Sequence, residues 1–158
     1  MTMPEMHEHI KFTGAFAKTE FAKNLFYQDG KKKDKRHLII AADSTTIDIK
    51  AMWGKLGVAA GNMSAGRSEE VMEKLLGVKK GGVTLFSIVN DVDNQVKLIV
   101  DKRLWDDFEY VGFHPMVNTA TTSISREDMK KVIELSGHEP TIIDFSDGAS
   151  GTVATGQP

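Results

Sequence analysis

The sequence predicts an α/β fold of the mixed, α+β-like kind, with a single mixed β-sheet and several helices packed on it. Two observations lead to this prediction. Strand-like and helix-like segments are interleaved irregularly along the chain, and several strand segments are close enough to pair as antiparallel hairpins. The irregular order and the hairpins argue against a doubly wound parallel sheet. In addition, no Gly-x-Gly-x-x-Gly or Walker-type loop is present.

The first half of the predicted domain contains a hairpin followed by two helices. Asp29-Gly30 is a turn signal after closely spaced apolar residues, and Gly57 and Gly77 are placed to end helices. Ser68 is an N-cap candidate with acidic residues after it. The expected elements are a strand at 20–30, a charged loop at 31–36, a strand at 37–42, a helix at 47–56, a brief strand at 62–65 and a helix at 68–77.

The second half predicts more strands and one further long helix. Gly81-Gly82 introduces an apolar run at 83–89, and Ser125 is an N-cap with Asp128 in the reciprocal position. Gly137 ends that helix. The expected elements are a strand at 96–101, one helical turn at 102–106, strands at 108–113 and 119–124, a helix at 125–137 and a strand at 141–145.

Length and composition are those of one globular domain. The chain has 158 residues, 41% hydrophobic and 27% charged, with a net charge of −2 and no cysteine. Disulfides, thiolate metal sites and a cysteine nucleophile are excluded, and any contact with nucleic acid must come from a local patch. With no signal-peptide pattern and no long apolar run, we expect a cytoplasmic protein without a membrane partner. We divide it into an N-terminal extension (1–18), a domain (19–146) and a flexible tail (147–158).

The stretch from Val111 to Thr122 carries the strongest functional signal. His114 lies directly before Pro115, at the end of an aromatic-rich strand, and an Asn and three Thr follow. The proline fixes its own backbone and biases His114 toward an extended conformation, so the imidazole is held beside amide and hydroxyl side chains. A β-turn corner with an ordinary histidine is an equally compatible interpretation of the local pattern.

Four segments occur together: Ala22–Phe26, Leu75–Thr84, Val111–Thr122 and Gly137–Pro140. Over roughly residues 20–145 the chain thereby resembles the prolyl-tRNA editing domains of the YbaK / prolyl-tRNA synthetase-associated family. The most similar branch is the one that deacylates alanine mischarged on tRNA for proline. The third segment is the most specific of the four. One position departs from the family pattern, since Leu85 stands where the glycine loop of the family usually ends in proline.

The resemblance implies hydrolysis of the ester between a wrong amino acid and the terminal adenosine of tRNA. It implies the YbaK / prolyl-tRNA synthetase editing-domain fold, no metal and no organic cofactor. The implied partners are a tRNA acceptor end carrying a small amino acid and prolyl-tRNA synthetase, whether the chain acts in trans or as an editing domain. By this mapping the catalytic residues are Lys23, Gly81, Gly82 and His114, and the substrate-binding residues are Asn24, Val83, Thr84, Asn118 and Thr119.

The implied chemistry suits these residue types. An aminoacyl ester is already activated, so its hydrolysis needs positioning and oxyanion stabilisation more than a strong nucleophile. Backbone N–H groups around Gly81 and Gly82 can approach a carbonyl oxygen closely because no Cβ intervenes. A lysine such as Lys23 can hold a phosphate or ribose oxygen. The nucleophile is either a water or a ribose hydroxyl, and a small pocket would exclude proline by size.

Each assignment also has a purely structural alternative. Lys23 can be a solvent-facing strand lysine with Asn24 on the opposite face, and Gly81-Gly82 can be a simple turn. The basic run at 31–36 is more typical of a solvated hairpin loop than of a tRNA contact. At the level of function, the rival is a non-catalytic module of the same fold that binds tRNA ends or a synthetase without turnover.

Overall fold

The computed structural model describes residues 14–32, 34–65, 69–146 and 153–155. The strands are β1 (Thr19–Asp29), β2 (Arg36–Ala42), β3 (Met63–Ala65), β4 (Val96–Asp101), β5 (Tyr110–Phe113), β6 (Thr122–Ser125), β7 (Thr141–Ile143) and β8 (Val153–Thr155). The α-helices are α2 (Ile49–Lys55), α3 (Glu69–Leu76), α4 (Lys102–Asp106) and α5 (Arg126–Leu135). Three 3-10 helices complete the fold: η1 (Gly14–Lys18), η2 (Ala60–Asn62) and η3 (Leu85–Asn90).

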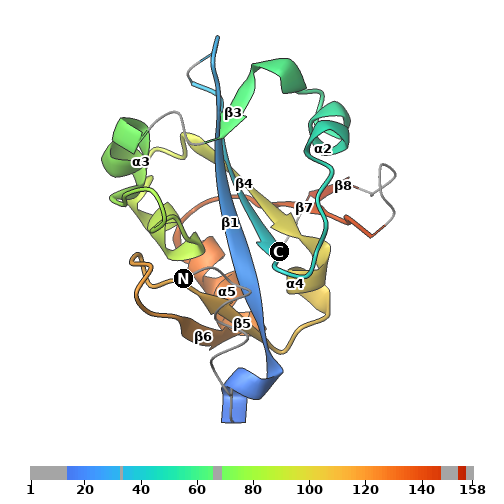
Figure 1. Ribbon diagram of the computed structural model, residues 1–158, viewed down its shortest axis with the longest axis vertical. Helices are drawn as coiled ribbons and strands as arrows, with labels where there is room; N and C mark the ends of the chain where they lie inside the picture. The colour runs from blue at the N-terminus through green and yellow to red at the C-terminus, as the bar shows by residue number, and fades with distance from the viewer. Residues whose placement is uncertain (1–13, 33, 66–68, 147–152, 156–158) are drawn as a thin grey trace.

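The strands form one mixed sheet, which confirms the predicted fold class. Their order is β6-β5-β1-β2-β4-β7-β8, and β3 pairs with β1 beside this path. The β1/β2, β1/β3, β5/β6 and β7/β8 pairs are antiparallel, whereas β1/β5, β2/β4 and β4/β7 are parallel. Figure 1 shows β1 as the long strand that runs through the length of the molecule. It is therefore the element most able to connect distant parts of the fold.

Both faces of the sheet are covered by helices. Because side chains alternate along each strand, β1 contributes residues to the core on each face. Ala22 and Phe26 of β1 face a large core to which α3, η3 and α5 contribute, whereas Leu25 and Tyr27 pack against a smaller core with α2. Figure 1 shows α3 and α2 on opposite sides of β1. The helices supply the following fully or nearly fully buried side chains: Met72, Leu76, Leu85, Ile88, Met129 and Ile133 to the first core, Met52 and Trp53 to the second.

Several local signals in the sequence are realised in the structure. Asp128 N–H donates to Ser125 Oγ (3.1 Å) at the start of α5, as expected for an N-cap. The N-cap candidate Ser68 lies outside the described residues. The apolar run at 83–89 becomes the 3-10 helix η3, with Leu85 and Ile88 buried three residues apart. Residues 153–155, which the sequence places in a loose tail, pair with β7 instead.

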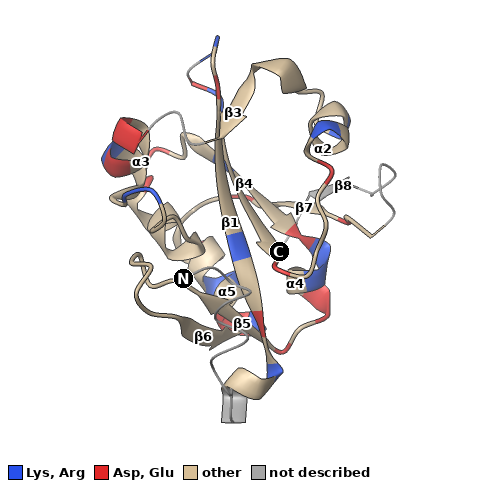
Figure 2. Cartoon of the chain, in the orientation of Figure 1, with Lys and Arg blue, Asp and Glu red and all other residues tan. Residues whose placement is uncertain are grey.

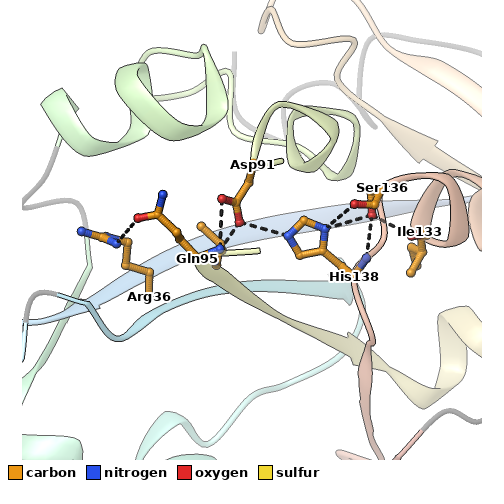
Figure 3. Close-up of polar contacts among 7 residues, drawn as sticks. Arg36, Asp91, Gln95, Ile133, Ser136 and His138 are labelled. Carbon is orange, nitrogen blue, oxygen red and sulfur yellow. Dashed lines mark hydrogen bonds and ion pairs between the residues drawn. The ribbon is translucent and has the colours of Figure 1, made fainter. Parts of the chain in front are cut away.

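A buried Asp91–His138 contact fixes the end of η3 to the loop that follows α5. His138 Nε2 lies 3.0 Å from Asp91 Oδ2, and the two side chains are 3% and 1% exposed. Asp91 also accepts from the N–H groups of Gln95 (3.0 Å) and Val96 (2.7 Å). The other ring nitrogen, Nδ1, lies 3.1 Å from the carbonyl oxygen of Ser136 (Figure 3). Both ring nitrogens of His138 thus contact oxygen atoms of the protein.

Removing this imidazole is expected to destabilise the fold. The His138→Ala variant leaves the Asp91 carboxylate buried with one partner fewer, and we expect a loss of about 2 kcal/mol in the free energy of unfolding. Urea unfolding measures it, with Glu139→Ala as the matched control because Glu139 is the exposed neighbour. Equal midpoints for the two variants would show that the Asp91–His138 contact contributes nothing.

A second buried histidine lies in the smaller core. The ring centroid of His37 is 5.0 Å from that of Trp53 in an edge arrangement, and Tyr27 packs against the same indole at 5.4 Å. Burial, reinforced by the charges of Lys97 and Lys35, lowers the pKa of His37 from 6.5 to about 4. His37 is therefore neutral in the folded protein at neutral pH.

Stability is expected to fall as the pH drops from 6.5 toward 4. In this window the unfolded chain binds a proton at His37 that the folded protein does not, so acid favours unfolding, by at most about 3 kcal/mol. Urea unfolding of wild type and His37→Phe across this range isolates the contribution, since phenylalanine keeps an aromatic ring without a titrating group. An identical pH slope for the two proteins would contradict the assignment.

Candidate active site at the open edge of β1

The central part of β1 has a strand neighbour on one edge only. On that edge β2 pairs with residues 22–28. On the other edge, β5 pairs with residues 19–21 and β3 with residues 27–29. Within the described part of the chain, no strand pairs with residues 22–26 on this second edge. A gap about five residues long therefore opens between β5 and β3.

Backbone polar groups of β1 face this gap. The carbonyl oxygen of Phe21 accepts from Asp43 N–H (2.7 Å) on the β2 side. Successive carbonyl groups of a strand point to opposite edges, so that of Ala22 faces the gap, where the Asn24 side-chain amide lies 3.4 Å from it. The backbone of Asn24 faces the same way. An unpaired strand edge of this kind offers donors and acceptors to a bound molecule.

A cavity of about 420 Å³ occupies the gap. All five consecutive residues of β1 from 22 to 26 line it, which one face of a strand cannot do because side chains alternate. The cavity therefore follows the edge of the strand. Its remaining lining residues come from β3, α3, the glycine loop and the segment after β5: Ala65, Met72, Lys80, Gly81, Val83 and His114.

Lys23 is held in place by backbone carbonyls. Its ammonium group donates to the carbonyl oxygens of Asp43 (3.2 Å) and Thr45, which follow β2. Thr45 is itself fixed, because its hydroxyl donates to Oδ2 of the buried Asp101 (2.5 Å) and accepts from Arg103 (3.1 Å). Two of the three ammonium hydrogens are thus used, and one is left for a ligand.

The glycine loop packs tightly against the segment after β5. A Cβ at Gly82 would lie only 2.7 Å from the carbonyl oxygen of Met116, and one at Gly81 would lie 3.4 Å from Asn118 Nδ2. Gly81 also has φ = +91°, a conformation that favours glycine. The N–H of Gly82 donates to Lys79 O (2.9 Å). The N–H groups of Gly81 and Val83 donate to no other described residue, so both are available as donors to a ligand.

One ring nitrogen of His114 contacts the backbone, and the other has no hydrogen-bond partner in the part of the chain that the structure describes. Its Nδ1 lies 2.8 Å from the carbonyl oxygen of Ala120, so Nδ1 carries the hydrogen. In the neutral ring Nε2 then has the lone pair and can accept a proton or a hydrogen bond. The sequence predicts that the orientation of this imidazole is fixed, and the contact with the Ala120 carbonyl oxygen is an interaction that can fix it.

The structure brings together five of the nine predicted site residues around the cavity: Lys23, Asn24, Gly81, Val83 and His114. Gly82 is buried within the glycine loop and does not line the cavity. Thr84 is fully buried, and its hydroxyl has no partner among the described residues. Asn118 and Thr119 lie exposed in the turn after β5 rather than in β6, and only Asn118 approaches the glycine loop. Thr84 and Thr119 do not line the cavity.

Sequence reasoning did not assign six of the lining residues to the site: Ala22, Leu25 and Phe26 of β1, and Ala65, Met72 and Lys80 from outside it. Met72 comes from the apolar face of α3, and Ala65 from the short strand β3, so neither differs from ordinary core residues in the sequence. Lys80 directly precedes Gly81, and this position beside the glycine loop is the signal that could have identified it. Asn24 itself lines the cavity, whereas its Oδ1 atom is buried and has no hydrogen-bond partner among the described residues.

The cavity is lined by cations and neutral groups. Lys23 and Lys80 contribute positive charge, and no Asp or Glu is among the described residues that line it. The described residues also contain no cluster of three potential metal ligands. Figure 2 shows Lys and Arg residues spread over several elements rather than gathered on one side in that view. A ligand with negative or developing negative charge is therefore favoured at this local site.

Comparison with known proteins gives one family. The model of the aminoacyl-tRNA editing domain matches residues 1–132. The chain is 34% identical over 145 residues to the mouse (Mus musculus) prolyl-tRNA synthetase associated domain-containing protein 1, covering 91% of this chain and 82% of that protein. It is 33% identical over 116 residues to the prolyl-tRNA editing protein ProX of Acetoanaerobium sticklandii, covering 73% and 68%.

A solved structure shares the fold. The crystal structure of hypothetical protein APE2540 matches with a TM-score of 0.54 and 20% identity, covering 78% of this chain and 73% of that chain. Among the described residues, no helix is both long and apolar enough to cross a membrane.

Proposed function

The chain belongs to the aminoacyl-tRNA editing domain family, and from that premise we propose that it is a deacylase of mischarged tRNA for proline. Alanine is its main substrate residue. It works on free aminoacyl-tRNA in trans or as an editing domain beside prolyl-tRNA synthetase, and we infer that it acts in the cytoplasm. The observation that carries the proposal is the meeting of Lys23, the glycine loop and His114 around one cavity.

The reaction adds water across an ester. The water oxygen bonds to the carbonyl carbon, the bond from that carbon to the ribose oxygen breaks, and a proton ends on the ribose oxygen. The free N–H groups of Gly81 and Val83 are the donors for the carbonyl oxygen as it gains negative charge. The lone pair of His114 Nε2, or a hydroxyl of the ribose itself, carries the proton in transit.

The remaining lining groups suit the rest of an aminoacyl-adenosine. The third hydrogen of the Lys23 ammonium is available for a ribose oxygen, because the other two are held by Asp43 and Thr45. The Oδ1 of Asn24 is buried without a partner among the described residues, and rotation of this amide toward the cavity would present it to the α-ammonium of an amino acid, which is a matching donor.

Selectivity for alanine requires local shape rather than total volume. A cavity of about 420 Å³ has room for an amino acid together with its ribose, so proline is not excluded by overall size. Exclusion must come from the walls beside the aminoacyl group, where Phe26, Met72 and Val83 contribute apolar surface. Steric overlap with a pyrrolidine ring there gives the second-sieve logic of editing.

Release of radiolabelled alanine from alanyl-tRNA for proline tests the proposal. The same tRNA charged with serine, cysteine or proline runs in parallel. We expect alanine to be released much faster than in buffer and proline to be retained. Release no faster than in buffer, together with binding of the tRNA, would contradict the deacylase and favour the non-catalytic binding module.

A further inference from the structure

Lys80 is a cation at the cavity without a structural role of its own. It lies in the loop that follows α3, is exposed to solvent and lines the cavity. Its ammonium group forms no hydrogen bond or ion pair with any other described residue. Lys23, the other lysine of the lining, already donates to two backbone carbonyls. Lys80 is therefore the lining cation that is most available to a ligand anion.

Its position in the chain relates it to the reacting atoms. Lys80 directly precedes Gly81, whose N–H is one of the two free donors of the glycine loop. The flexible four-carbon side chain of Lys80 therefore starts one residue away from a proposed donor to the carbonyl oxygen. In an aminoacyl-tRNA the anionic group nearest to the ester is the phosphate on the 5′ side of the terminal adenosine. The cavity lining contains no carboxylate that would compete for the lysine or repel this phosphate.

We propose that Lys80 binds the phosphate of the terminal nucleotide and thereby helps to hold the acceptor end of the tRNA at the cavity. This inference rests on the proposed function, because it takes an aminoacylated nucleic-acid end as the ligand. It adds that efficient deacylation needs a substrate with this phosphate, whereas the proposed catalytic residues contact only the aminoacyl ester and the ribose. Its neighbour Lys79 is equally exposed but does not line the cavity, so the pair provides a matched comparison.

Two substrates separate a phosphate contact from a general defect. The first is alanyl-tRNA for proline, and the second is alanyl-adenosine, which has the ester and the ribose but no phosphate. For Lys80→Ala we expect KM for the tRNA to rise roughly tenfold with kcat nearly unchanged. The slope of log(kcat/KM) against log salt should become shallower by about 0.7. With alanyl-adenosine, Lys80→Ala and wild type should agree within about twofold, and Lys80→Arg should retain most of the tRNA activity.

Several results would overturn the inference. These are an equal loss on both substrates, an equal effect of Lys79→Ala, or no effect of Lys80→Ala on the tRNA. If wild type hydrolyses neither substrate, the proposed function fails and the phosphate contact is decided by binding. In that case Lys80→Ala must weaken binding of a CCA trinucleotide while Lys79→Ala does not, and equal affinities would reject the contact.

Discussion

Replacing Lys23 with alanine is expected to lower kcat/KM for alanine release by about two orders of magnitude. The ammonium group is fixed by the carbonyl oxygens of Asp43 and Thr45, and Thr45 is anchored in turn to the buried Asp101. A donor held in this way is already oriented before the substrate arrives, so its loss affects the positioning of the ester directly. Single-turnover release of alanine from the charged tRNA measures the effect without interference from product release.

Two controls separate positioning from folding. Lys97→Ala removes an exposed lysine from strand β4 and should leave kcat/KM unchanged within about twofold. Removing the lysine frees two carbonyl oxygens at a part-buried site, so folding must be checked as well. Thermal unfolding of Lys23→Ala should show that the domain still folds. If Lys23→Ala deacylates as fast as wild type, the role of the lysine is wrong even though the enzyme survives.

The Gly82→Ala substitution is expected to reduce kcat/KM by a similar factor through a different cause. Gly82 does not line the cavity, yet its added Cβ would lie 2.7 Å from the carbonyl oxygen of Met116. The crowding atoms belong to the backbone of Met116 and Lys79, and backbone cannot rotate out of the way as a side chain can. The glycine loop and the segment that carries His114 must therefore move apart. Displacing catalytic groups by about 1 Å costs roughly 10²-fold in rate. The measurement is again single-turnover release.

Gly54→Ala is the matched control for this steric effect. A Cβ at Gly54 meets nothing within 4 Å, and the residue is exposed in α2 and does not line the cavity. This variant should keep full activity and gain up to about 1 kcal/mol in stability, because alanine is the better helix former. Wild-type activity in Gly82→Ala would mean that close packing of the two segments does not position the catalytic groups.

The sequence predicts local structure well where one short-range signal decides it. The Ser125 cap, the hairpin turn after Asp29 and the apolar stripe of α3 depend on neighbours a few residues away, and the corresponding elements are found. The run at 83–89 is different, because a short apolar run does not distinguish a strand from a helical turn. Tertiary packing settles it as η3, with Leu85 and Ile88 in the core and Val89 47% exposed.

The arrangement of the site depends on pairings that no local pattern contains. Lys23, Gly81 and His114 are recognisable as residue types in motifs, but the cavity exists because β5 and β3 pair with different ends of β1. β5 is a parallel partner from about 90 residues further along the chain. The same long-range packing buries Thr84 and places Thr119 in an exposed turn, so two predicted contacts do not reach the cavity.

The most direct test is to bind a non-hydrolysable amide analogue of alanyl-adenosine and follow the backbone amide signals by ¹⁵N NMR. A site at the open edge of β1 predicts shifts confined to the residues that line the cavity, with the largest at residues 22–26, Gly81, Val83 and His114. The exposed apolar residues Val92 and Leu135, which do not line the cavity, should stay silent. Shifts centred on those two residues, with the β1 edge and the glycine loop unchanged, would contradict the assignment of this cavity as the editing site.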